Sequence, residues 1–365
     1  MKQGKNTKAV KIGGFSHVRT VYIGGENRIA VQTMWKDSLN DANIESAVQK
    51  IESLQSIGCE LLRFAVPTIK SAEVLGRLAE ITSMPLVADI HFDYKIALRC
   101  MDFPVSKIRI NPGNIGVKEH VKKVLEKAGK SGIPIRIGVN AGSLPADLRA
   151  KKGEDCAPAM VQAALREIDV FKEFGFTDYL VSMKASKIAD NIHANRILSE
   201  LTDAPLHIGV TEAGPLAAGV ARNTVAIVTL INEGIGDTIR VSLSDTMENE
   251  IIAGREILAA AAEISGYPRL KCGGVNIISC PRCGRHSFDT LGFTNRWMSR
   301  FYAMDKDITI AVMGCEVNGP EEARHADIGI TGAGDKVLIF KHGKVVKTIT
   351  AAEADAAIKE EIDKL

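Results

Sequence analysis

The chain has 365 residues, of which 45% are hydrophobic and 25% are charged, and its formal net charge is +2. This composition supports a large core and more than one domain, and the near-neutral charge argues against nucleic acid as a partner. The opening MKQGKNTKAV has no apolar signal core, and no apolar run approaches the ~20 residues of a membrane span. Seven cysteines without a disulfide framework are typical of a reducing compartment. We therefore expect a soluble, cytoplasmic protein that binds neither nucleic acid nor membrane.

The first patterned segment, residues 10–31, alternates apolar and polar residues around Gly24 and Gly25. This pattern predicts a β-hairpin, which would cap the bottom of the fold that follows.

From about residue 30 to 265 the chain repeats one unit, in which a short apolar run is followed by a polar loop and then by a helix-period segment. The apolar runs are rich in Val and Ile, as is typical of parallel strands buried on both faces. The predicted strands are 30–34, 61–66, 85–90, 107–111, 134–140, 179–183, 205–210 and 238–243. The predicted helices are 43–57, 72–81, 117–128, 157–174, 188–201, 223–233 and 247–264.

Eight strands alternating with helices over this length predict an α/β fold of the TIM (β/α)8 barrel type. A doubly wound open sheet is the alternative, but no G-x-G-x-x-G follows the first strand to support a dinucleotide site.

After Pro268 the pattern changes to short strands at 275–279, 307–313, 326–331, 336–341 and 344–349, with helices expected at 290–304 and 351–365. We therefore expect two domains, a barrel with its hairpin over residues 1–267 and a small α+β domain over 268–365, joined near 266–271.

The carboxyl ends of the eight predicted strands are unusually polar. Functional groups of a TIM barrel stand at these ends, so these side chains should share one mouth. They are Arg63, Asp89, His91, Arg109, Asn111, Asn114, Arg136, Asn140, Ser182, Lys184, Lys187, His207, Thr211, Glu212, Arg240, Ser242 and Ser244. The excess of cations predicts a polyanionic ligand, since guanidinium groups suit phosphate oxygens. The alternatives are internal pairing with Asp89, Glu212 and Asp237, or side chains that point outward under the helices.

The small domain carries a cysteine pattern typical of a metal centre. Cys280 and Cys283 lie in ISCPRCGR, which reads as a loop, and Cys315 lies in MGCEVNGPEEA. Three thiolates without an obvious fourth predict an iron–sulfur cluster with one unusual ligand. Structural zinc with Cys272 as fourth ligand, a redox dithiol, and unligated thiols are the alternatives.

The order and spacing of several motifs resemble one known family, the bacterial 4-hydroxy-3-methylbut-2-enyl diphosphate synthases of the methylerythritol phosphate route to isoprenoids. The motifs are VQTM (31–34), RFAVP (63–67), ADIHFDY (88–94), KIRINPGNIG (107–116), IRIGVNAGSL (135–144), HIGVTEAG (207–214), IRVSLS (239–244), SCPRCGR (279–285) and GCEVNGPEEA (314–323). The resemblance covers nearly the whole chain.

The resemblance implies a 4Fe–4S cluster held by Cys280, Cys283, Cys315 and Glu322, with Cys272 left out. It also implies reductive opening of 2-C-methyl-D-erythritol 2,4-cyclodiphosphate, with electrons from flavodoxin or ferredoxin. The family works as a homodimer in which the cluster domain of one subunit closes over the barrel of the other. One departure is Glu321, where the family commonly has glycine. It would be penalised if that position needs a positive φ, and it offers a second carboxylate.

Within this resemblance, the polar strand ends take specific expected roles. His91 and Glu212 are candidates for proton transfer, and Glu212 suits a donor to the leaving hydroxyl. The alternative for His91 is a supporting hydrogen bond. The cyclic diphosphate would be held by Arg63, Arg109, Asn111, Arg136, Asn140, Lys184, Arg240 and Ser242. A phosphate-binding barrel with a structural zinc ribbon is the alternative function, and metal content would distinguish it.

Overall fold

The computed structural model describes residues 6–38, 40, 43–111, 115, 117–149, 154–266, 268–270 and 274–365, and for Pro268, Asn318 and Glu322 it describes the backbone alone. The chain divides into two compact units, Met1–Cys272 and Gly273–Leu365. None of the described helices combines the length and apolar character needed to cross a membrane.

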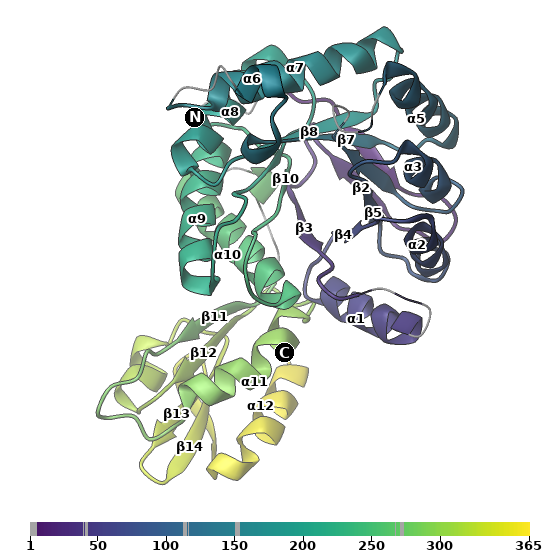
Figure 1. Ribbon diagram of the computed structural model, residues 1–365. Helices are drawn as coiled ribbons and strands as arrows, with labels where there is room; N and C mark the ends of the chain where they lie inside the picture. The colour runs from purple at the N-terminus through teal and green to yellow at the C-terminus, as the bar shows by residue number, and fades with distance from the viewer. Residues whose placement is uncertain are drawn as a thin grey trace. The chain divides into compact units, whose positions relative to one another are not determined.

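The first unit is built on eight parallel strands, which Figure 1 shows surrounded by helices. They are β3 (Ala30–Met34), β4 (Leu61–Ala65), β5 (Leu86–Asp89), β6 (Lys107–Ile110), β7 (Ile135–Asn140), β8 (Tyr179–Lys184), β9 (His207–Ile208) and β10 (Thr238–Ile239). Their order is β8-β7-β6-β5-β4-β3-β10-β9, and a parallel bridge between Val181 and Leu206 joins the two ends. The predicted TIM barrel is confirmed, and the open-sheet alternative is wrong.

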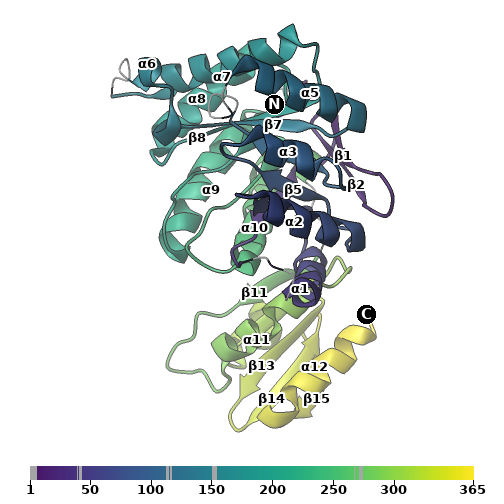
Figure 2. The same cartoon turned by 45° about the vertical axis from the view of Figure 1, so that its right-hand side comes forward.

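The helices outside the barrel follow the strands in alternation (Figure 2). They are α1 (Ile44–Ser56), α2 (Ile69–Ile81), α3 (Tyr94–Cys100), α5 (Lys118–Ser131), α6 (Ala146–Arg149), α7 (Ala157–Glu173), α8 (Ile188–Leu201), α9 (Leu216–Asn232) and α10 (Met247–Ser265), with 3-10 turns η2 (Ala141–Ser143) and η3 (Pro268–Leu270). The sequence analysis missed α3 and α6, which are too short to show a helical period. It also started α9 too late, since that helix begins directly after Pro215, in an Ala- and Gly-rich stretch.

The last two barrel strands are much shorter than predicted. Regular pairing covers two residues each in β9 and β10, where six were expected. Gly209 ends β9 with a φ of 139°, and a Cβ there would meet the carbonyl oxygen of Arg240 at 2.2 Å. The backbones approach too closely for an ordinary side chain, so the ladder stops at this glycine.

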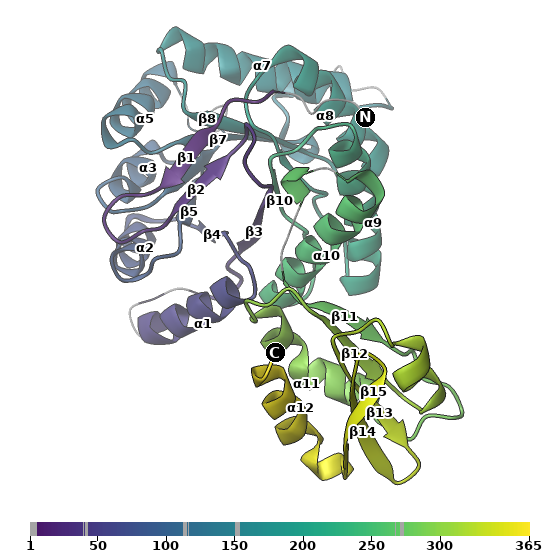
Figure 3. The same cartoon turned by 180° about the vertical axis from the view of Figure 1, so that it is seen from behind.

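A hairpin closes the bottom of the barrel, as predicted. Strands β1 (Val10–Gly13) and β2 (Thr20–Ile23) pair antiparallel, and Figure 3 shows them across one end of the barrel. Val10, Ile12 and Ile23 pack on barrel residues near the starts of four strands, namely Ala30, Leu61, Val87 and Leu180. The turn lies between the two strands, after Gly13 and Gly14 with φ of 70° and 77°, and not at Gly24 and Gly25 as predicted.

The second unit is a five-stranded sheet with helices on one face. Its strands are β11 (Asn276–Ser279), β12 (Thr309–Met313), β13 (Ile328–Ala333), β14 (Lys336–Lys341) and β15 (Lys344–Ile349), in that order across the sheet. β11, β12 and β13 are parallel, and the last two pairings are antiparallel.

The helices of this unit are α11 (Thr290–Tyr302) and α12 (Ala354–Asp363), the latter preceded by the 3-10 turn η5 (Ala351–Glu353). They share one core with the sheet, in which Phe293, Trp297 and Ile358 are buried. A π-helical turn, η4 (Val317–Glu322), ends beside a separate apolar cluster that contains Ala323 and Phe340. The second unit therefore has the α+β architecture predicted for it.

Candidate functional site

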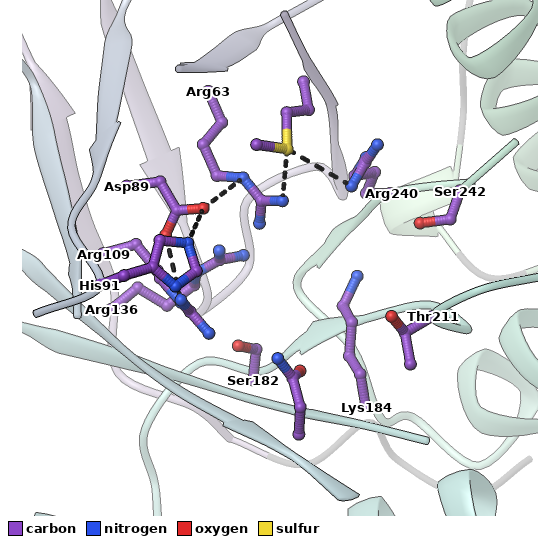
Figure 4. Close-up of a pocket in the computed structure, with 12 residues that line it drawn as sticks. Arg63, Asp89, His91, Arg109, Arg136, Ser182, Lys184, Thr211, Arg240 and Ser242 are labelled. Atoms are coloured by element: carbon purple, nitrogen blue, oxygen red, sulfur yellow. Dashed lines mark hydrogen bonds and ion pairs between the residues drawn. The ribbon is translucent and has the colours of Figure 1, made fainter. Parts of the chain in front are cut away.

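A polar cavity of about 200 Å³ opens among the barrel strands. Figure 4 shows Asp89, His91, Arg109 and Arg136 on one side of it, with Lys184 and Thr211 on the other. The described lining residues come from all eight strands or the residues shortly after them, and all but one are polar. They are Met34, Arg63, Asp89, His91, Arg109, Arg136, Asn140, Ser182, Lys184, Thr211, Arg240 and Ser242. Because parallel strands end at one face of a barrel, side chains far apart in the sequence meet here.

Asp89 is the single carboxylate of the lining, and two arginines converge on it. Arg109 Nη1 lies 3.1 Å from Oδ1, and Arg63 Nε lies 3.5 Å from Oδ2. His91 Nε2 lies 3.4 Å from the same Oδ2. Burial by itself would raise the pKa of Asp89, but the His91 hydrogen bond and the charges of Arg63, Arg109 and Arg136 outweigh it and lower the pKa below its ordinary value. Asp89 is therefore ionised and fixes Arg63, Arg109 and His91 around the cavity.

Glu250, which the sequence analysis missed, anchors the opposite wall. This fully buried carboxylate on α10 accepts two hydrogen bonds from Arg240, Nε to Oε2 at 3.2 Å and Nη2 to Oε1 at 3.1 Å. It also accepts from Thr33 Oγ1 at 2.5 Å and from the Leu243 amide at 3.0 Å, and pairs with Lys36 at 3.0 Å. In the sequence, Glu250 is recognisable only as a carboxylate in the first turn of a predicted helix. Such carboxylates commonly interact with the helix dipole, so the position gives no indication of a role at the cavity.

Two cations of the lining are buried without a carboxylate. Among the described residues, neither Arg136 nor Lys184 forms an ion pair, and Arg136 Nε and Nη1 have no hydrogen-bond partner. Burial, followed by repulsion from neighbouring arginines, lowers the pKa of Lys184 well below its ordinary value, and the same two causes lower that of Arg136. An unpaired buried charge is costly, so this arrangement is suited to an anion that enters with its own negative charges.

A further polar layer lies in the barrel interior. Lys107 Nζ donates to Gln32 Oε1 at 3.3 Å, and both residues are fully buried. His207 is also fully buried, and neither ring nitrogen has a partner among the described residues. Burial, then the charges of Lys184 and Arg136, lower the pKa of His207 well below its ordinary value. The interior therefore favours a neutral imidazole and adds positive potential beneath the cavity.

The structure brings most of the predicted barrel candidates together. Arg63, His91, Arg109, Arg136, Asn140, Lys184, Arg240 and Ser242 all line the cavity.

The other strand-end candidates are not among the described lining residues; they are Asn111, Asn114, Lys187, His207, Glu212 and Ser244. Asn111 is nearly buried but does not line the cavity. Glu212 is exposed, directly after the lining residue Thr211, and has a φ of 53°. Asn114 lies outside the described residues, and Lys187 pairs with Asp190 at 3.1 Å.

The cysteine-bearing loops of the second unit leave the same end of two neighbouring strands. β11 and β12 are parallel and adjacent, with Ser279 opposite Val312, so Cys280 and Cys315 follow strand ends that lie side by side. A Cβ placed on Gly314 would lie 3.7 Å from Cys280 Sγ. The backbone of the second loop at Gly314 therefore lies close to the sulfur of the first loop.

Backbone hydrogen bonds shape this site. The Arg282 amide donates to Cys280 Sγ at 3.4 Å, and Arg282 itself has a φ of 69°. Thr331 Oγ1 donates to the Cys315 carbonyl at 2.7 Å. Glu321 lies in η4 and is not among the described non-glycine residues with positive φ, so the replacement of glycine brings no left-handed strain.

The donor set fits an iron–sulfur cluster. Cys280, Cys283 and Cys315 supply three thiols from two neighbouring loops, and amide-to-sulfur hydrogen bonds of the Arg282 kind are typical of such sites. The described residues contain no gathered group of three His, Cys, Asp or Glu side chains, and both the Glu322 side chain and Cys272 lie outside the description. By contrast, burial raises the pKa of both Cys59 and Cys100 to about 12, so these thiols stay protonated.

Comparison with known proteins covers both units. The model of the GcpE TIM-barrel domain matches residues 7–255, and that of the GcpE protein C-terminal domain matches residues 276–364. The chain is 48% identical to the 4-hydroxy-3-methylbut-2-en-1-yl diphosphate synthase (flavodoxin) of Treponema denticola, over 96% of this chain and 94% of the relative. Identity to the proteins of the same name is 47% in Treponema pallidum (98% of this chain, 92% of the relative) and 42% in Clostridium acetobutylicum (98% and 99%).

Proposed function

The chain belongs to the GcpE family, and from this membership and the cation-rich barrel cavity we propose that it converts 2-C-methyl-D-erythritol 2,4-cyclodiphosphate to 4-hydroxy-3-methylbut-2-enyl diphosphate. The reaction breaks the bond between C2 of the ring and its phosphate oxygen, and the bond between C3 and its hydroxyl. A double bond forms between these two carbons. Two electrons are consumed, the hydroxyl leaves as water after taking a proton, and the freed diphosphate keeps the bridging oxygen.

The observation that carries this proposal is the buried pair of cations, Arg136 and Lys184, which form no direct ion pair among the described residues. A cyclic diphosphate supplies negative oxygens to these groups, while Arg63, Arg109 and Arg240 are already oriented by Asp89 and Glu250. Asn140 and Ser242 line the same cavity and can donate hydrogen bonds to the substrate. The barrel therefore binds and orients the diphosphate ring, and it stabilises the charge that develops when the ring opens.

Proton transfer falls to residues at the cavity rim. His91 is half-exposed and is held by Asp89, which suits a side chain that orients the substrate or exchanges a proton with it. Glu212 follows Thr211 at the rim, outside the cavity lining, so it serves as donor to the departing hydroxyl only when a bound substrate extends that far. Asn111, which is buried directly after β6, is proposed to donate a hydrogen bond to the bound substrate.

The second unit is proposed to hold a 4Fe–4S cluster through Cys280, Cys283, Cys315 and Glu322. When bound, this cluster supplies the two electrons and, at the iron held by the harder carboxylate ligand, a Lewis acid. The electron donor is a flavodoxin, with ferredoxin as the alternative, in keeping with the names of the relatives. The expected setting is the reducing cytoplasm, where thiols are not oxidised to disulfides.

Cysteine substitution tests the assignment of the second unit. Cys280→Ser, Cys283→Ser and Cys315→Ser should each abolish cluster assembly and conversion of the cyclic diphosphate, since each removes one of three thiolate ligands. The measurements are iron and sulfide content after anaerobic purification, visible absorption, and product formation with a chemical reductant.

Cys272→Ser and Cys100→Ser are the controls and should keep their iron. Full iron content and activity in any one of the first three variants would show that its thiol is not a ligand. A colourless, zinc-loaded wild-type protein would instead favour a structural zinc site.

A further inference from the structure

We propose that the loop after β11 and the exposed face of α11 form the docking surface for the electron donor, a flavodoxin that approaches with an acidic face. This inference rests on the proposed function, and it adds where on the chain the donor binds and which charges guide it.

The charges of the second unit are distributed unevenly. Residues 281–300, all of them described, carry four arginines and a single carboxylate. The rest of the unit, residues 301–365, carries eight Lys or Arg against twelve Asp or Glu. A carrier with a carboxylate-rich face is therefore attracted to one end of this unit and repelled from the remainder, which orients its approach.

The four arginines lie on exposed segments around the first cysteine pair. Residues 281–287 are all exposed, and this stretch includes Arg282 and Arg285 on either side of Cys283. Arg296 and Arg300 are also exposed, and their spacing of four residues places them on one face of α11. Arg282 pairs with Asp289 at 3.5 Å and Arg296 with Asp355 at 3.4 Å, so Arg285 and Arg300 contribute most of the net positive charge. The cationic surface therefore begins beside the exposed Cys283 thiol and continues along α11 to its last turn.

Hydrogen bonds hold the start of α11 against the cysteine loop. Thr290 Oγ1 donates to the Cys280 carbonyl at 3.3 Å, and the hydroxyls of Ser279 and Thr294 lie 3.4 Å apart. The loop and the helix therefore present one continuous surface.

Aromatic rings support the helix arginines. The Arg300 guanidinium lies 5.1 Å from the Trp297 ring centre, and that of Arg296 lies 5.8 Å from the Phe293 ring centre. Side chains held in this way lose less conformational freedom when a partner binds them.

The exposure of the thiols fits electron entry at this surface. Cys283 is exposed and Cys280 is half-buried, whereas Cys315 is buried. Each encounter passes one electron from a flavodoxin hydroquinone, which becomes the semiquinone. Two encounters provide the two electrons that ring opening and loss of the hydroxyl consume.

Charge reversal on the intact, cluster-loaded enzyme tests the proposal. Arg285→Glu and Arg300→Glu should each lower kcat/KM for reduced flavodoxin by about fivefold, and together by more, while flattening its dependence on salt. With saturating dithionite as reductant, both variants should convert the cyclic diphosphate at the wild-type rate. Lys344→Glu is the matched control, since Lys344 is exposed on β15, at the opposite edge of the sheet from β11, and it should leave both assays unchanged.

The outcomes separate the docking surface from the proposed function. Unchanged kcat/KM for flavodoxin in the double variant would overturn the docking surface while wild-type activity with dithionite stands. Equal loss with flavodoxin and dithionite, at full iron content, would assign the arginines to the substrate and also overturn it. A wild-type enzyme that is inactive with either reductant would contradict the proposed function itself.

Discussion

At the scale of single residues, Arg136 is the group whose environment most directly calls for an anion. Its side chain is fully buried, and two of its nitrogens lack a partner among the described residues. Arg109, by contrast, already has Asp89 as its counter-charge. The two arginines should therefore respond differently to removal, although both line the cavity.

We predict that Arg136→Ala weakens binding of the cyclic diphosphate by roughly tenfold or more, because charge-assisted hydrogen bonds contribute about 1.5–3 kcal/mol. Arg109→Ala should also weaken binding, but it additionally leaves the buried Asp89 with one counter-charge fewer, so it should lower thermal stability as well. Calorimetric titration and thermal unfolding measure the two effects, with iron content as the control. Unchanged affinity in both variants would mean that the diphosphate binds elsewhere.

Most cavity residues could be predicted from the sequence because they follow one rule of the fold. Arg63, Arg109, Lys184 and Arg240 lie near strand ends, and parallel strand ends share one face of a barrel. Glu250 could not be found in this way, since it reaches the cavity wall from α10. The rule also does not predict how far along the barrel axis a side chain lies. For this reason Asn111 and Glu212 were grouped with residues that line the cavity.

At the scale of the elements, a glycine on β7 creates the space for an arginine. A Cβ on Gly138 would meet Arg109 Nε at 2.3 Å and Cζ at 2.8 Å. The clash involves the end of a flexible side chain, so the strand can keep its place while the guanidinium moves. β7 thus determines the position of a charge that β6 carries.

We therefore predict that Gly138→Ala displaces Arg109 and reduces affinity for the cyclic diphosphate several-fold, while the melting temperature changes little. Gly142→Ala is the control, since a Cβ at Gly142 meets nothing within 4 Å and that glycine has no positive φ. Binding titrations of the two variants provide the comparison. Equal affinities would show that the position of the Arg109 guanidinium is unimportant for binding.

The elements themselves were predictable where the apolar period was long and regular. The strands of the second unit were placed within about two residues at either end, because each is a bounded apolar run. The periods failed at β9 and β10, where the apolar pattern continues to Val210 and Leu243 although the strand pairing ends at Ile208 and Ile239. The hairpin turn was misplaced for a related reason, since two glycine pairs compete as turn signals and the turn follows Gly13, where β1 ends, and Gly14.

At the scale of the whole molecule, the chain leaves the barrel at the end opposite the cavity. α10 has 19 residues and is about 28 Å long. Beyond it, Arg269 donates to the Asn27 carbonyl at 2.6 Å and pairs with Asp237 at 2.8 Å, and these two partners precede β3 and β10. The six residues 266–271 can span at most about 20 Å, which is less than the length of α10, so they can hardly return the cluster to the cavity of the same barrel. We therefore propose a homodimer in which each cluster serves the barrel of the partner subunit.

Mixing Cys315→Ser with Arg109→Ala, at a substrate concentration too low for Arg109→Ala to turn over by itself, tests this arrangement. In a mixed dimer one interface carries both lesions and the other carries neither, so random exchange should restore about a quarter of wild-type activity. Activity is measured after exchange has been demonstrated with tagged subunits. If exchange occurs and no activity returns, each cluster serves its own barrel.

The central claim is that one chain joins a diphosphate-binding barrel to a cluster that reduces its ligand. The most direct measurement is a single-turnover reaction of anaerobically purified protein with the cyclic diphosphate and excess dithionite, followed by product analysis by phosphorus and carbon NMR. The wild-type protein should yield 4-hydroxy-3-methylbut-2-enyl diphosphate with two electrons consumed per molecule, and Cys315→Ser and Arg136→Ala should yield little or none. Recovery of unchanged cyclic diphosphate from wild-type protein with full iron and sulfide content would contradict the account.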